Sequence, residues 1–409
     1  MPEVLTIVYL VYIFISLYFL FLFALTFVQN RKEMFSYKKS KKNYSISVII
    51  PAHNEEDTIR NTIEQVLKSD YKNILEVIVA TNACTDRTVK IARELSKNYK
   101  KLKVLNLKIP GKANALNEAL KIARGELFAV VDADSYPDTN ALNSMVGFFD
   151  DTAVGGVTTR ILVKHRDNFL RKMQAIEYKV IAFTRKLLDF LDSIYVTPGP
   201  LALYRKSALQ KIGGFDLKNM TEDIEATWHL IHEGYKVRMS FISKSTTVAP
   251  SKLSVWFKQR VRWNIGGFQT IIKYKHCWFR KGMLGYFILP LFSIMLVLSV
   301  FGLGIFGYII FRRIFYTYLA THYSFIAETT FFAFQDINLN PNILNFLGLV
   351  SFILGLMFIY FALVFVNKNL NEKENFFSVI FYSLVYILLR PIVLIASMYK
   401  FIRGKYSWR

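Results

Sequence analysis

The sequence predicts an α/β domain, built on a parallel sheet with helices on its faces, inserted between α-helical transmembrane segments. Three observations support this class. Long uncharged runs lie at the two ends of the 409-residue chain. Between about residues 44 and 275, short β-rich runs alternate with helical ones, as in βαβ units. Finally, 53% of the residues are hydrophobic and only 20% are charged, which excludes ordinary soluble and disordered chains.

The first apolar run, Val4–Val28, carries no formal charge. As a helix rising about 1.5 Å per residue it would cross a hydrocarbon layer of about 30 Å. A cleaved signal peptide is the alternative, but nothing basic precedes the run, the run is too long, and no small-residue cleavage site follows. The charged residues that follow are almost all basic, so the helix is expected to end in the cytoplasm with its N-terminus outside: Arg31, Lys32, Lys38, Lys39, Lys41 and Lys42 against Glu33.

The C-terminal part contains three further apolar runs, 283–311, 343–366 and 376–399, the last interrupted only by Arg390, and they predict three further spans. An arginine inside a span is expected to face the interior of the bundle or a polar path, with a snorkelling side chain or a misplaced boundary as the alternative. The stretch 316–334 is apolar but contains His322 and Glu328, so a fourth span, a re-entrant piece and an amphipathic surface helix all remain open. The basic C-terminus favours the cytoplasm and an even number of C-terminal crossings. We therefore predict a multi-pass protein of the cell membrane with its central domain in the cytoplasm.

The formal charge of +22, from 52 Lys and Arg against 30 Asp and Glu, raises the question of nucleic acid. Much of this charge flanks the membrane segments, where anionic headgroups and topology explain it, so no nucleic-acid partner is expected. Cys84 and Cys277 both fall in the part assigned to the cytoplasm, where thiols stay reduced and no disulfide is expected.

Polar and acidic side chains follow the predicted strands of the central domain. The strands are 46–50, 76–80, 103–106 and 127–131, and the helices between them are 55–68, 86–97 and 111–123. His53-Asn54-Glu55 follows the first strand, residues 82–86 follow the second, and Asp132-Ala133-Asp134 follows the fourth. Ligands of open α/β sheets bind at the carboxyl ends of the strands, so this edge is the candidate site.

Asp132 and Asp134 place two carboxylates at the sharp end of a strand, where alternate residues project to the same side. Oxygen ligands of this kind suit a hard divalent cation, which in turn suits a diphosphate. A surface turn can contain the same pattern by chance. Here it ends an entirely apolar strand, which favours the functional interpretation.

Two more clusters stand out further along the chain. Thr221-Glu222-Asp223 opens the helical run 224–233, where helix capping is the structural alternative. Gln259-x-x-Arg262-Trp263 lies inside a basic, aromatic and amphipathic stretch, 256–274, of the kind that lies on membrane surfaces. His229 and His232 are three apart on a predicted helix, but no third ligand accompanies them, so we interpret them as surface or packing residues.

The order Asp86, Asp132-x-Asp134, Thr221-Glu222-Asp223 and Gln259-x-x-Arg262-Trp263 resembles the processive family 2 glycosyltransferases: cellulose, chitin, hyaluronan and especially poly-N-acetylglucosamine synthases. PAHNEE, GKANALN, TPGPLALYRKSAL and TEDIEATWHL are also similar to segments of these enzymes. The likeness covers about residues 46–275 and the flanking spans. It implies a Rossmann-like catalytic domain of the GT-A type, with amphipathic interface helices between the transmembrane segments.

The resemblance also implies roles for single residues. Asp86 and Glu55 would hold the base and ribose of the nucleotide, and Lys112 would lie near the uridine or the phosphates. Asp132 would face the sugar of the nucleoside, and Asp134 would bind Mg²⁺ or Mn²⁺ at the diphosphate. The segment Cys277-Trp278-Phe279-Arg280 lies where related synthases have a gating loop, although it lacks a clear form of their motifs.

The acceptor side is assigned in the same way. Asp223, beside Glu222, would be the general base that takes the proton of the acceptor hydroxyl, which gives inversion at the anomeric carbon. Gln259 and Arg262 would bind the diphosphate, and Trp263 would offer a platform to the acceptor sugar. The amphipathic run 168–191, with Arg171, Lys172, Lys179, Arg185 and Lys186, would lie on the cytoplasmic leaflet, with an ordinary surface helix as the alternative.

We therefore expect a membrane-integrated inverting glycosyltransferase that polymerises a β-linked polysaccharide from a UDP-sugar, UDP-N-acetylglucosamine for preference, and extrudes it across the membrane. The alternatives are transfer of one sugar to a polyprenyl phosphate or other lipid, and a transporter whose cytosolic domain only senses nucleotide-sugars. The expected parts are 1–43 (anchor and linker), 44–252 (catalytic), 253–282 (interface helix) and 283–409 (spans). The expected partners are the UDP-sugar, the growing polysaccharide and the bilayer. Because three to five spans make a narrow channel, a second copy or an accessory subunit is a further expected partner.

Overall fold

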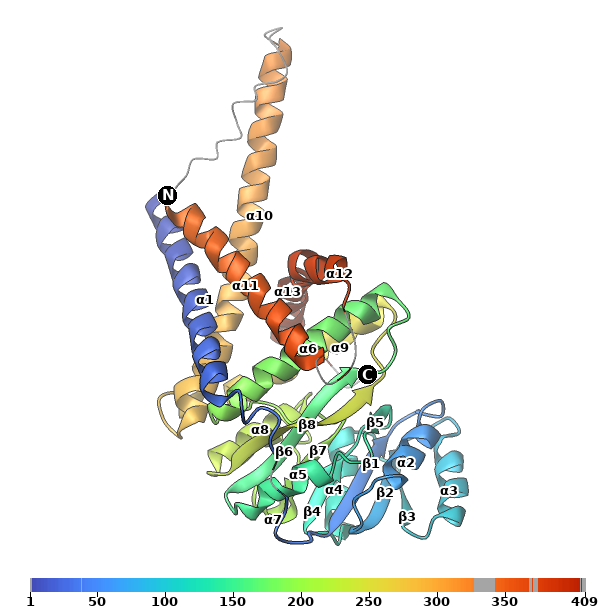
Figure 1. Ribbon diagram of the computed structural model, residues 1–409. Coiled ribbons are helices and arrows are strands. Elements are labelled where there is room, and N and C mark those ends of the chain that lie inside the picture. Colours follow the sequence, from blue (N-terminus) through green and yellow to red (C-terminus); the bar gives the residue numbers. More distant parts are fainter. Residues whose placement is uncertain are drawn as a thin grey trace.

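The computed structural model describes residues 2–37, 39–326, 343–367, 370, 374–404 and 406. Its central domain is an eight-stranded sheet of order β3-β2-β1-β4-β7-β6-β8-β5, with helices on both faces (Figure 1). The strands are β1 Ile46–Ala52, β2 Ile74–Asn82, β3 Leu102–Leu107, β4 Leu127–Val130, β5 Ser135–Pro137, β6 Val154–Val163, β7 Ala202–Arg205 and β8 Lys236–Thr247.

The first half of the sheet confirms the prediction from the sequence. Strand β1 pairs in parallel with β2 and β4, and β2 pairs in parallel with β3. The connecting helices are α2 Ile59–Leu67, α3 Thr88–Asn98 and α4 Lys112–Ile122. Every residue of β1 and β4 is buried, which explains why Ser47 is the one polar residue in these two strands.

The expectation of an entirely parallel sheet is wrong for the second half. Strand β7 runs antiparallel to both β4 and β6, and β5 runs antiparallel to β8, while β6 and β8 are parallel. The reversal at β7 directs the segment before it past the end of β4, where the backbone N–H of Asp132 donates to Gly199 O (2.9 Å). A mixed sheet therefore brings a second loop to the carboxylates that follow β4.

Two long helices lie between the sheet and the apolar helices: α6 Phe169–Phe190 and α9 Leu253–Lys273. Asn168 caps α6 by accepting the N–H of Arg171 (2.8 Å). We expected the basic residues of α6 to face headgroups, but Lys179 and Lys186 are buried inside the protein. Lys186 Nζ lies 2.6 Å from Asp189 Oδ2, and Lys179 Nζ lies 2.5 Å from Glu374 Oε1. These cations stabilise contacts within the protein instead.

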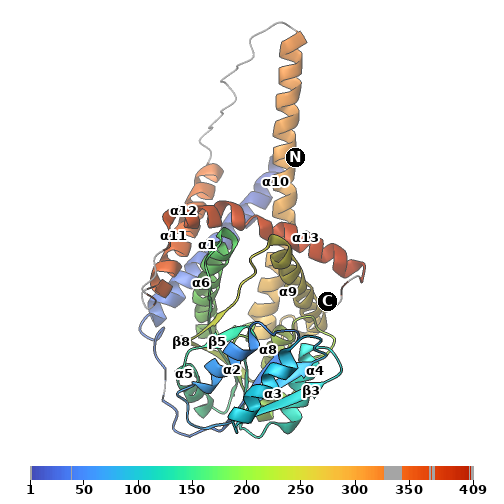
Figure 2. The ribbon, with the colours of Figure 1, turned by 90° about the vertical axis from the view of Figure 1, so that its right-hand side faces the viewer.

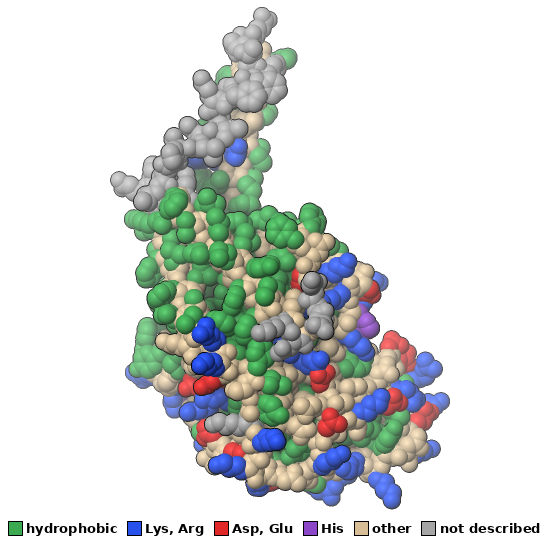
Figure 3. All heavy atoms as spheres, viewed as in Figure 1, with side chains coloured by type: hydrophobic (Ala, Val, Ile, Leu, Met, Phe, Trp, Pro, Cys, Tyr) green, Lys and Arg blue, Asp and Glu red, His purple; other side chains and the backbone are tan. Residues whose placement is uncertain are grey.

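Four helices in the described part are long and apolar enough to cross a membrane: 6–30, 284–326, 346–367 and 376–402. They correspond to α1 Pro2–Asn30, the π-helix η3 Leu284–Ile288 with α10 Leu289–Ile326, α11 Ile343–Asn367, and the run of α12 Phe376–Phe381, η5 Tyr382–Tyr386 and α13 Leu389–Ile402. Figure 3 shows hydrophobic side chains gathered over this helical part, and charged side chains over the central domain.

The segment 316–334 is not a separate element as far as the structure describes it. Helix α10 continues unbroken to Ile326, and the rest of the segment lies outside the described residues. Its 38 residues make a helix of about 57 Å, longer than a hydrocarbon layer of about 30 Å. Accordingly, α10 projects beyond the other helices in Figure 1.

The last apolar run takes a different direction from α10. Figures 1 and 2 together show α10 upright and the run from α12 to α13 lying across it, at the level of α6 and α9. The N-terminal end of α1 lies far from the sheet, whereas the C-terminal end of α13 lies closer to it (Figure 2).

The remaining short helices of the central domain are α5 Asn143–Val146, η1 Gly147–Asp150, α7 Lys206–Lys211 and α8 Glu222–His232, and η2 Lys275–Cys277 follows α9. Of these, α8 matters most for the site, because its first turn carries Glu222 and Asp223.

Candidate active site

Lys112 joins two of the acidic motifs that the sequence singled out. Its Nζ lies 2.6 Å from Asp132 Oδ1, after β4, and 2.8 Å from Glu222 Oε1, at the start of α8. Burial lowers the pKa of Lys112, but the charges of Asp132 and Glu222 outweigh it, and the pKa is raised well above its usual value. The ammonium group is therefore a permanent cation that holds the segment after β4 to the start of α8.

The neighbouring acids Glu222 and Asp223 have opposite electrostatic environments. Burial opposes ionisation of Glu222, but the nearby charge of Lys112 and then that of Arg262 outweigh it and lower its pKa. Burial and the charge of Glu222 raise the pKa of Asp223 to about 6. Asp223 Oδ1 accepts the backbone N–H of Ile224 (2.9 Å), and the side chain stays partly exposed. Such a carboxylate can take a proton near neutral pH.

Asp134 carries a surplus of negative charge at the same edge. Its Oδ1 accepts hydrogen bonds from Ser135 Oγ (3.0 Å) and Thr247 Oγ1 (3.3 Å). Burial, followed by the charge of Asp132, raises the pKa of Asp134 to about 6, and burial with the charges of Asp134 and Asp132 raises the pKa of Glu55 to about 7. Clustered carboxylates whose ionisation is opposed in this way fit a divalent cation with oxygen ligands.

Asp86 has a structural role that the sequence did not indicate. Its Oδ1 accepts the N–H of Thr88 (3.0 Å) at the start of α3, and its Oδ2 accepts the N–H of Glu56 (3.1 Å). Burial raises the pKa of Asp86, but the hydrogen bonds from Thr88 and Glu56 outweigh it and lower the pKa. Asp86 therefore joins the loop after β1, which carries Glu55, to the loop after β2.

Helix α9 packs directly on the start of α8, whose first turn carries Glu222 and Asp223. A Cβ on Gly266 would lie 2.0 Å from Thr221 Oγ1, so the side chain of Thr221 packs against the backbone of α9 in the space that the glycine leaves. Beside it, the N–H of Met220 donates to Gln269 Oε1 (2.8 Å). This contact places the Gln259-x-x-Arg262-Trp263 motif next to the acids of α8.

A pair of neighbouring glycines on α9 tests this contact. We expect Gly266→Ala to force Thr221 and its loop away, at a cost of about 1–3 kcal/mol, and to lower turnover. Gly267→Ala is the matched control, because a Cβ there meets nothing within 4 Å and alanine favours a helix by about 1 kcal/mol. Thermal unfolding and UDP release by both variants are the measurement; equal behaviour of the pair would contradict the contact.

The motif on α9 has one polar atom without a partner. Gln259 Oε1 is buried and accepts no hydrogen bond within the described structure, a state that costs free energy unless a ligand donates to it. Arg262 lies close enough to Glu222 to lower the pKa of that acid. The ring of Trp263 is partly exposed, and the guanidinium of Arg260 lies 4.2 Å from its centre.

An ion cluster around the buried carboxylate of Glu177, which the sequence did not reveal, holds α9 and its motif in place. Glu177 of α6 accepts from Arg260 Nη2 and Arg390 Nη2, each at 2.6 Å, and from the hydroxyl of Tyr386 at 2.9 Å. Burial opposes ionisation of Glu177, but the charges of Arg260 and Arg390 outweigh it and lower its pKa. Arg390 therefore faces protein, as its place in an apolar run indicated. Glu177 connects α6, α9 and the last apolar run.

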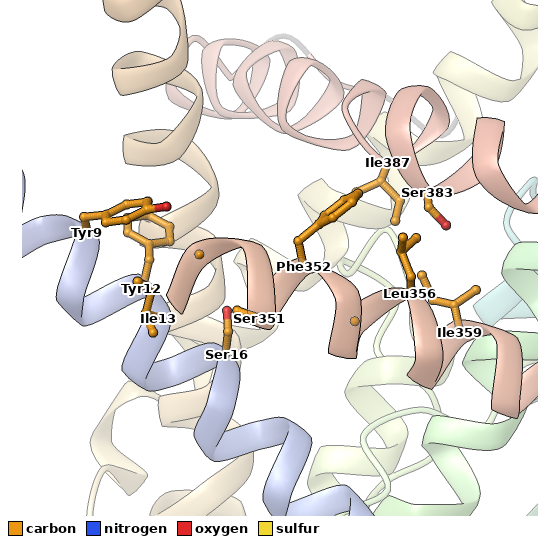
Figure 4. A pocket seen from close by; sticks show the side chains of 12 residues that line it. Tyr9, Tyr12, Ile13, Ser16, Ser351, Phe352, Leu356, Ile359, Ser383 and Ile387 are labelled. Atoms are coloured by element: carbon orange, nitrogen blue, oxygen red, sulfur yellow. The ribbon is translucent and has the colours of Figure 1, made fainter. Parts of the chain in front are cut away.

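A cavity of about 350 Å³ lies among the apolar helices, well separated in sequence from the acidic motifs. Figure 4 shows side chains of α1, α11 and the last apolar run pointing into it. The lining is mixed, with the aromatic rings of Tyr9, Tyr12 and Phe352 and the hydroxyls of Ser16, Ser351 and Ser383.

The fold and this acidic edge define a glycosyltransferase with a GT-A fold. One solved structure to which the chain is similar is a mannosyltransferase from Pyrobaculum calidifontis in complex with GDP-Man and Mn²⁺, with a TM-score of 0.58 and 18% identity over 96% of this chain and 99% of that one. At this identity the likeness establishes the fold.

Residues 47–213 match the family described as glycosyl transferase family 2. The poly-beta-1,6-N-acetyl-D-glucosamine synthase of Staphylococcus aureus (strain MSSA476) is 28% identical over 63% of this chain and 62% of its own length, so this match spans less than two thirds of that relative. The synthase of Staphylococcus epidermidis is 28% identical over 88% of this chain and 84% of its own length. The probable glycosyltransferase YdaM of Bacillus subtilis (strain 168) is 28% identical over 88% and 83%.

Proposed function

We propose that the protein is an inverting polysaccharide synthase that uses UDP-N-acetylglucosamine as its donor. The observation that carries this proposal is the close approach of Gly266 to Thr221, which joins the motif of polymer synthases to the acids of α8. The names of the staphylococcal relatives support the donor and the polymer.

In this proposal the donor lies along the carboxyl edge of the sheet. Glu55 and Asp86 bind the nucleoside, Asp132 faces its ribose, and Lys112 keeps that carboxylate in place while lying near the phosphates. Gln259 and Arg262 bind the diphosphate from α9, and a phosphate-bound water or hydroxyl donates to the unpartnered Gln259 Oε1.

Asp134 would hold Mg²⁺ or Mn²⁺, with Asp132 and Glu55 close enough to contribute to its negative surroundings. When bound, the cation supplies a Lewis acid that neutralises charge on the leaving diphosphate.

Asp223 performs the proton transfer. The acceptor hydroxyl attacks the anomeric carbon on the face opposite the diphosphate, its proton passes to Asp223, and the bond from the anomeric carbon to the UDP oxygen breaks. The single displacement inverts the configuration and gives a β-linkage from an α-linked donor. Glu222 stays ionised beside Lys112 and keeps the pKa of Asp223 high enough for this task. Trp263 provides the stacking surface for the acceptor sugar.

We propose the division 1–43, 44–252, 253–282 and 283–409 for anchor, catalytic domain, interface helix and apolar helices. The catalytic domain lies in the cytoplasm of a multi-pass membrane protein, with the N-terminus outside. The run from α12 to α13 lies across α10, which supports α10 and α11 as the crossings after the catalytic domain, an even number, in place of the three or four spans that the sequence predicts. The cavity of Figure 4 offers rings and hydroxyls to a glycan on its way outward, and a second copy or an accessory subunit would widen this path.

The competing function is transfer of one sugar to a lipid phosphate, which a membrane-embedded site would also serve. The test is incubation of the purified, detergent-solubilised protein with labelled UDP-sugars and Mn²⁺ or Mg²⁺, followed by sizing of the product. We expect material of high mass from UDP-N-acetylglucosamine alone. Label confined to one sugar on co-purified lipid would overturn the polymer assignment and favour the lipid acceptor.

The raised pKa values predict opposite effects of pH on activity and stability. UDP release is expected to rise as pH increases through about 6, where Asp134 and Asp223 ionise. A carboxyl whose pKa is raised in the folded state stabilises the fold while protonated, so this contribution is lost as pH rises through about 6 to 7. Thermal unfolding of the ligand-free protein at pH 5 and pH 8, together with a pH–rate profile, checks both; activity that falls between pH 5 and 7 would contradict the assignment.

A further inference from the structure

The end of α8 and the segment after α9 bring together metal-binding side chains that lie apart in the sequence. Among the described residues, one donor atom each from His232, His276 and Cys277 lie within 4.8 Å of one another. His232 ends α8, and the other two belong to η2. His229, the partner of His232 in the sequence pattern, is not part of this cluster.

We propose that His232, His276 and Cys277 form a second metal site, distinct from the carboxylate site, that binds a borderline or soft transition metal of the Zn²⁺ class. Two imidazoles and one thiolate are donors that Zn²⁺ prefers and that Mg²⁺ and Mn²⁺ do not. Bonds of about 2.0–2.3 Å set tetrahedral donors about 3.3–3.8 Å apart, so contraction by about 1 Å completes the site. The exposed side chain of His276 supplies that movement.

The surroundings of His232 resemble the outer shell of a zinc ligand. One of its ring nitrogens, Nδ1, lies 3.2 Å from Glu233 Oε1, so the proton is expected there. A histidine held this way by a carboxylate presents its other nitrogen, Nε2, as a lone-pair donor. Glu233 in turn lies 3.6 Å from Lys211 Nζ, which keeps it ionised and in position.

Cys277 is held rigidly at the same place. Its side chain is fully buried beside Trp228, Tyr274 and Leu284, and its N–H donates to Tyr274 O (2.9 Å). A thiol binds a metal as its thiolate, so metal binding must displace a proton. Binding is therefore expected to strengthen as pH rises.

The site has a mechanical consequence. A metal bound here ties the last turn of α8, whose first turn carries Asp223, to the segment that joins α9 to the first C-terminal apolar helix. Three protein donors also leave a fourth position for water or another ligand.

Metal analysis of the full-length protein tests the proposal. The protein, purified in detergent and stripped by a chelator, is equilibrated with Zn²⁺ in excess Mg²⁺, which occupies oxygen-ligand sites, then desalted and analysed for zinc. We expect about one zinc per chain, retained in His229→Ala and Cys84→Ser, which remove a neighbouring histidine and the other cysteine. Cys277→Ser and His276→Ala are expected to lower zinc at least tenfold.

Substitution with Co²⁺ reports the ligands directly, since a thiolate bound to Co²⁺ adds an absorption band in the near ultraviolet. The band is expected in the wild type and absent from Cys277→Ser, while circular dichroism shows that the variant is folded. Absence of bound zinc from the wild type, or equal zinc in Cys277→Ser and Cys84→Ser, would overturn the site. Neither readout requires sugar transfer, so failure here leaves the proposed function untouched.

Discussion

Asp223→Asn is expected to lower sugar transfer by about 10²–10⁴-fold, the usual contribution of a general base, and to leave UDP binding nearly unchanged. The asparagine keeps the shape of the side chain but cannot take the proton of the acceptor hydroxyl. Transfer is measured with labelled donor, and binding of UDP is measured separately by calorimetry.

The unfolding temperature of Asp223→Asn shows whether this variant is folded. Ionised Asp223 is opposed by burial and by the charge of Glu222, so a neutral side chain removes an unfavourable interaction at neutral pH. The variant is therefore expected to unfold at the wild-type temperature or above it. Glu222→Gln is the matched comparison, because it breaks the 2.8 Å ion pair with Lys112 and should lower the unfolding temperature. Sugar transfer at the wild-type rate by Asp223→Asn would remove Asp223 from the mechanism.

Glu177→Ala is expected to produce the largest loss of stability, about 3–5 kcal/mol, since it leaves the buried charge of Arg260 and the half-exposed charge of Arg390 without their carboxylate. The position of Trp263 on α9 should change as well, because Arg260 lies against its ring. We therefore expect a lower unfolding temperature and reduced transfer, with UDP still bound at the sheet edge.

Three further variants serve as comparisons for the loss of stability in Glu177→Ala. Glu177→Gln preserves the size and part of the hydrogen bonding, so its loss should be smaller than that of Glu177→Ala. Arg390→Gln should also cost less, because the Arg390 side chain is about half exposed. Asp167→Ala removes a mostly exposed carboxylate at the start of the same helix, from an ion pair with Arg171, and should cost under about 1 kcal/mol. Equal unfolding temperatures for Glu177→Ala and Asp167→Ala would show that the cluster does not stabilise the protein.

The first half of the fold could be predicted because its information is local. Strands such as β4 are buried on both faces and therefore read as unbroken apolar runs, and the acids after them mark the carboxyl edge. The apolar runs at the two ends are equally local, since length and lack of charge suffice to recognise them. Family resemblance supplied what local patterns lacked, namely the order of the acidic motifs along the chain. The roles of the individual site residues remain proposals.

The second half could not be predicted because strand direction is a long-range property. The segment from β6 to β8 contains strands that a pattern of residues identifies poorly, and only pairing with β4 decides that β7 runs antiparallel. The hydrogen bond from the N–H of Asp132 to Gly199 O depends on that pairing. Likewise, Lys112 and Glu222 are more than a hundred residues apart, so no spacing announces their contact.

The sequence by itself determined the class of the protein, since hydrophobic run length and strand alternation depend on neighbouring residues, and the order of the motifs follows directly from the order of residues along the chain. Only the tertiary structure decided which charges neutralise each other. In the folded protein Lys112 forms ion pairs with Asp132 and Glu222, and Arg390 forms one with Glu177. Folding also brings His232 close to Cys277. The physical reason is that burial and Coulomb interaction depend on distance in space, which a chain establishes only when its distant segments pack together.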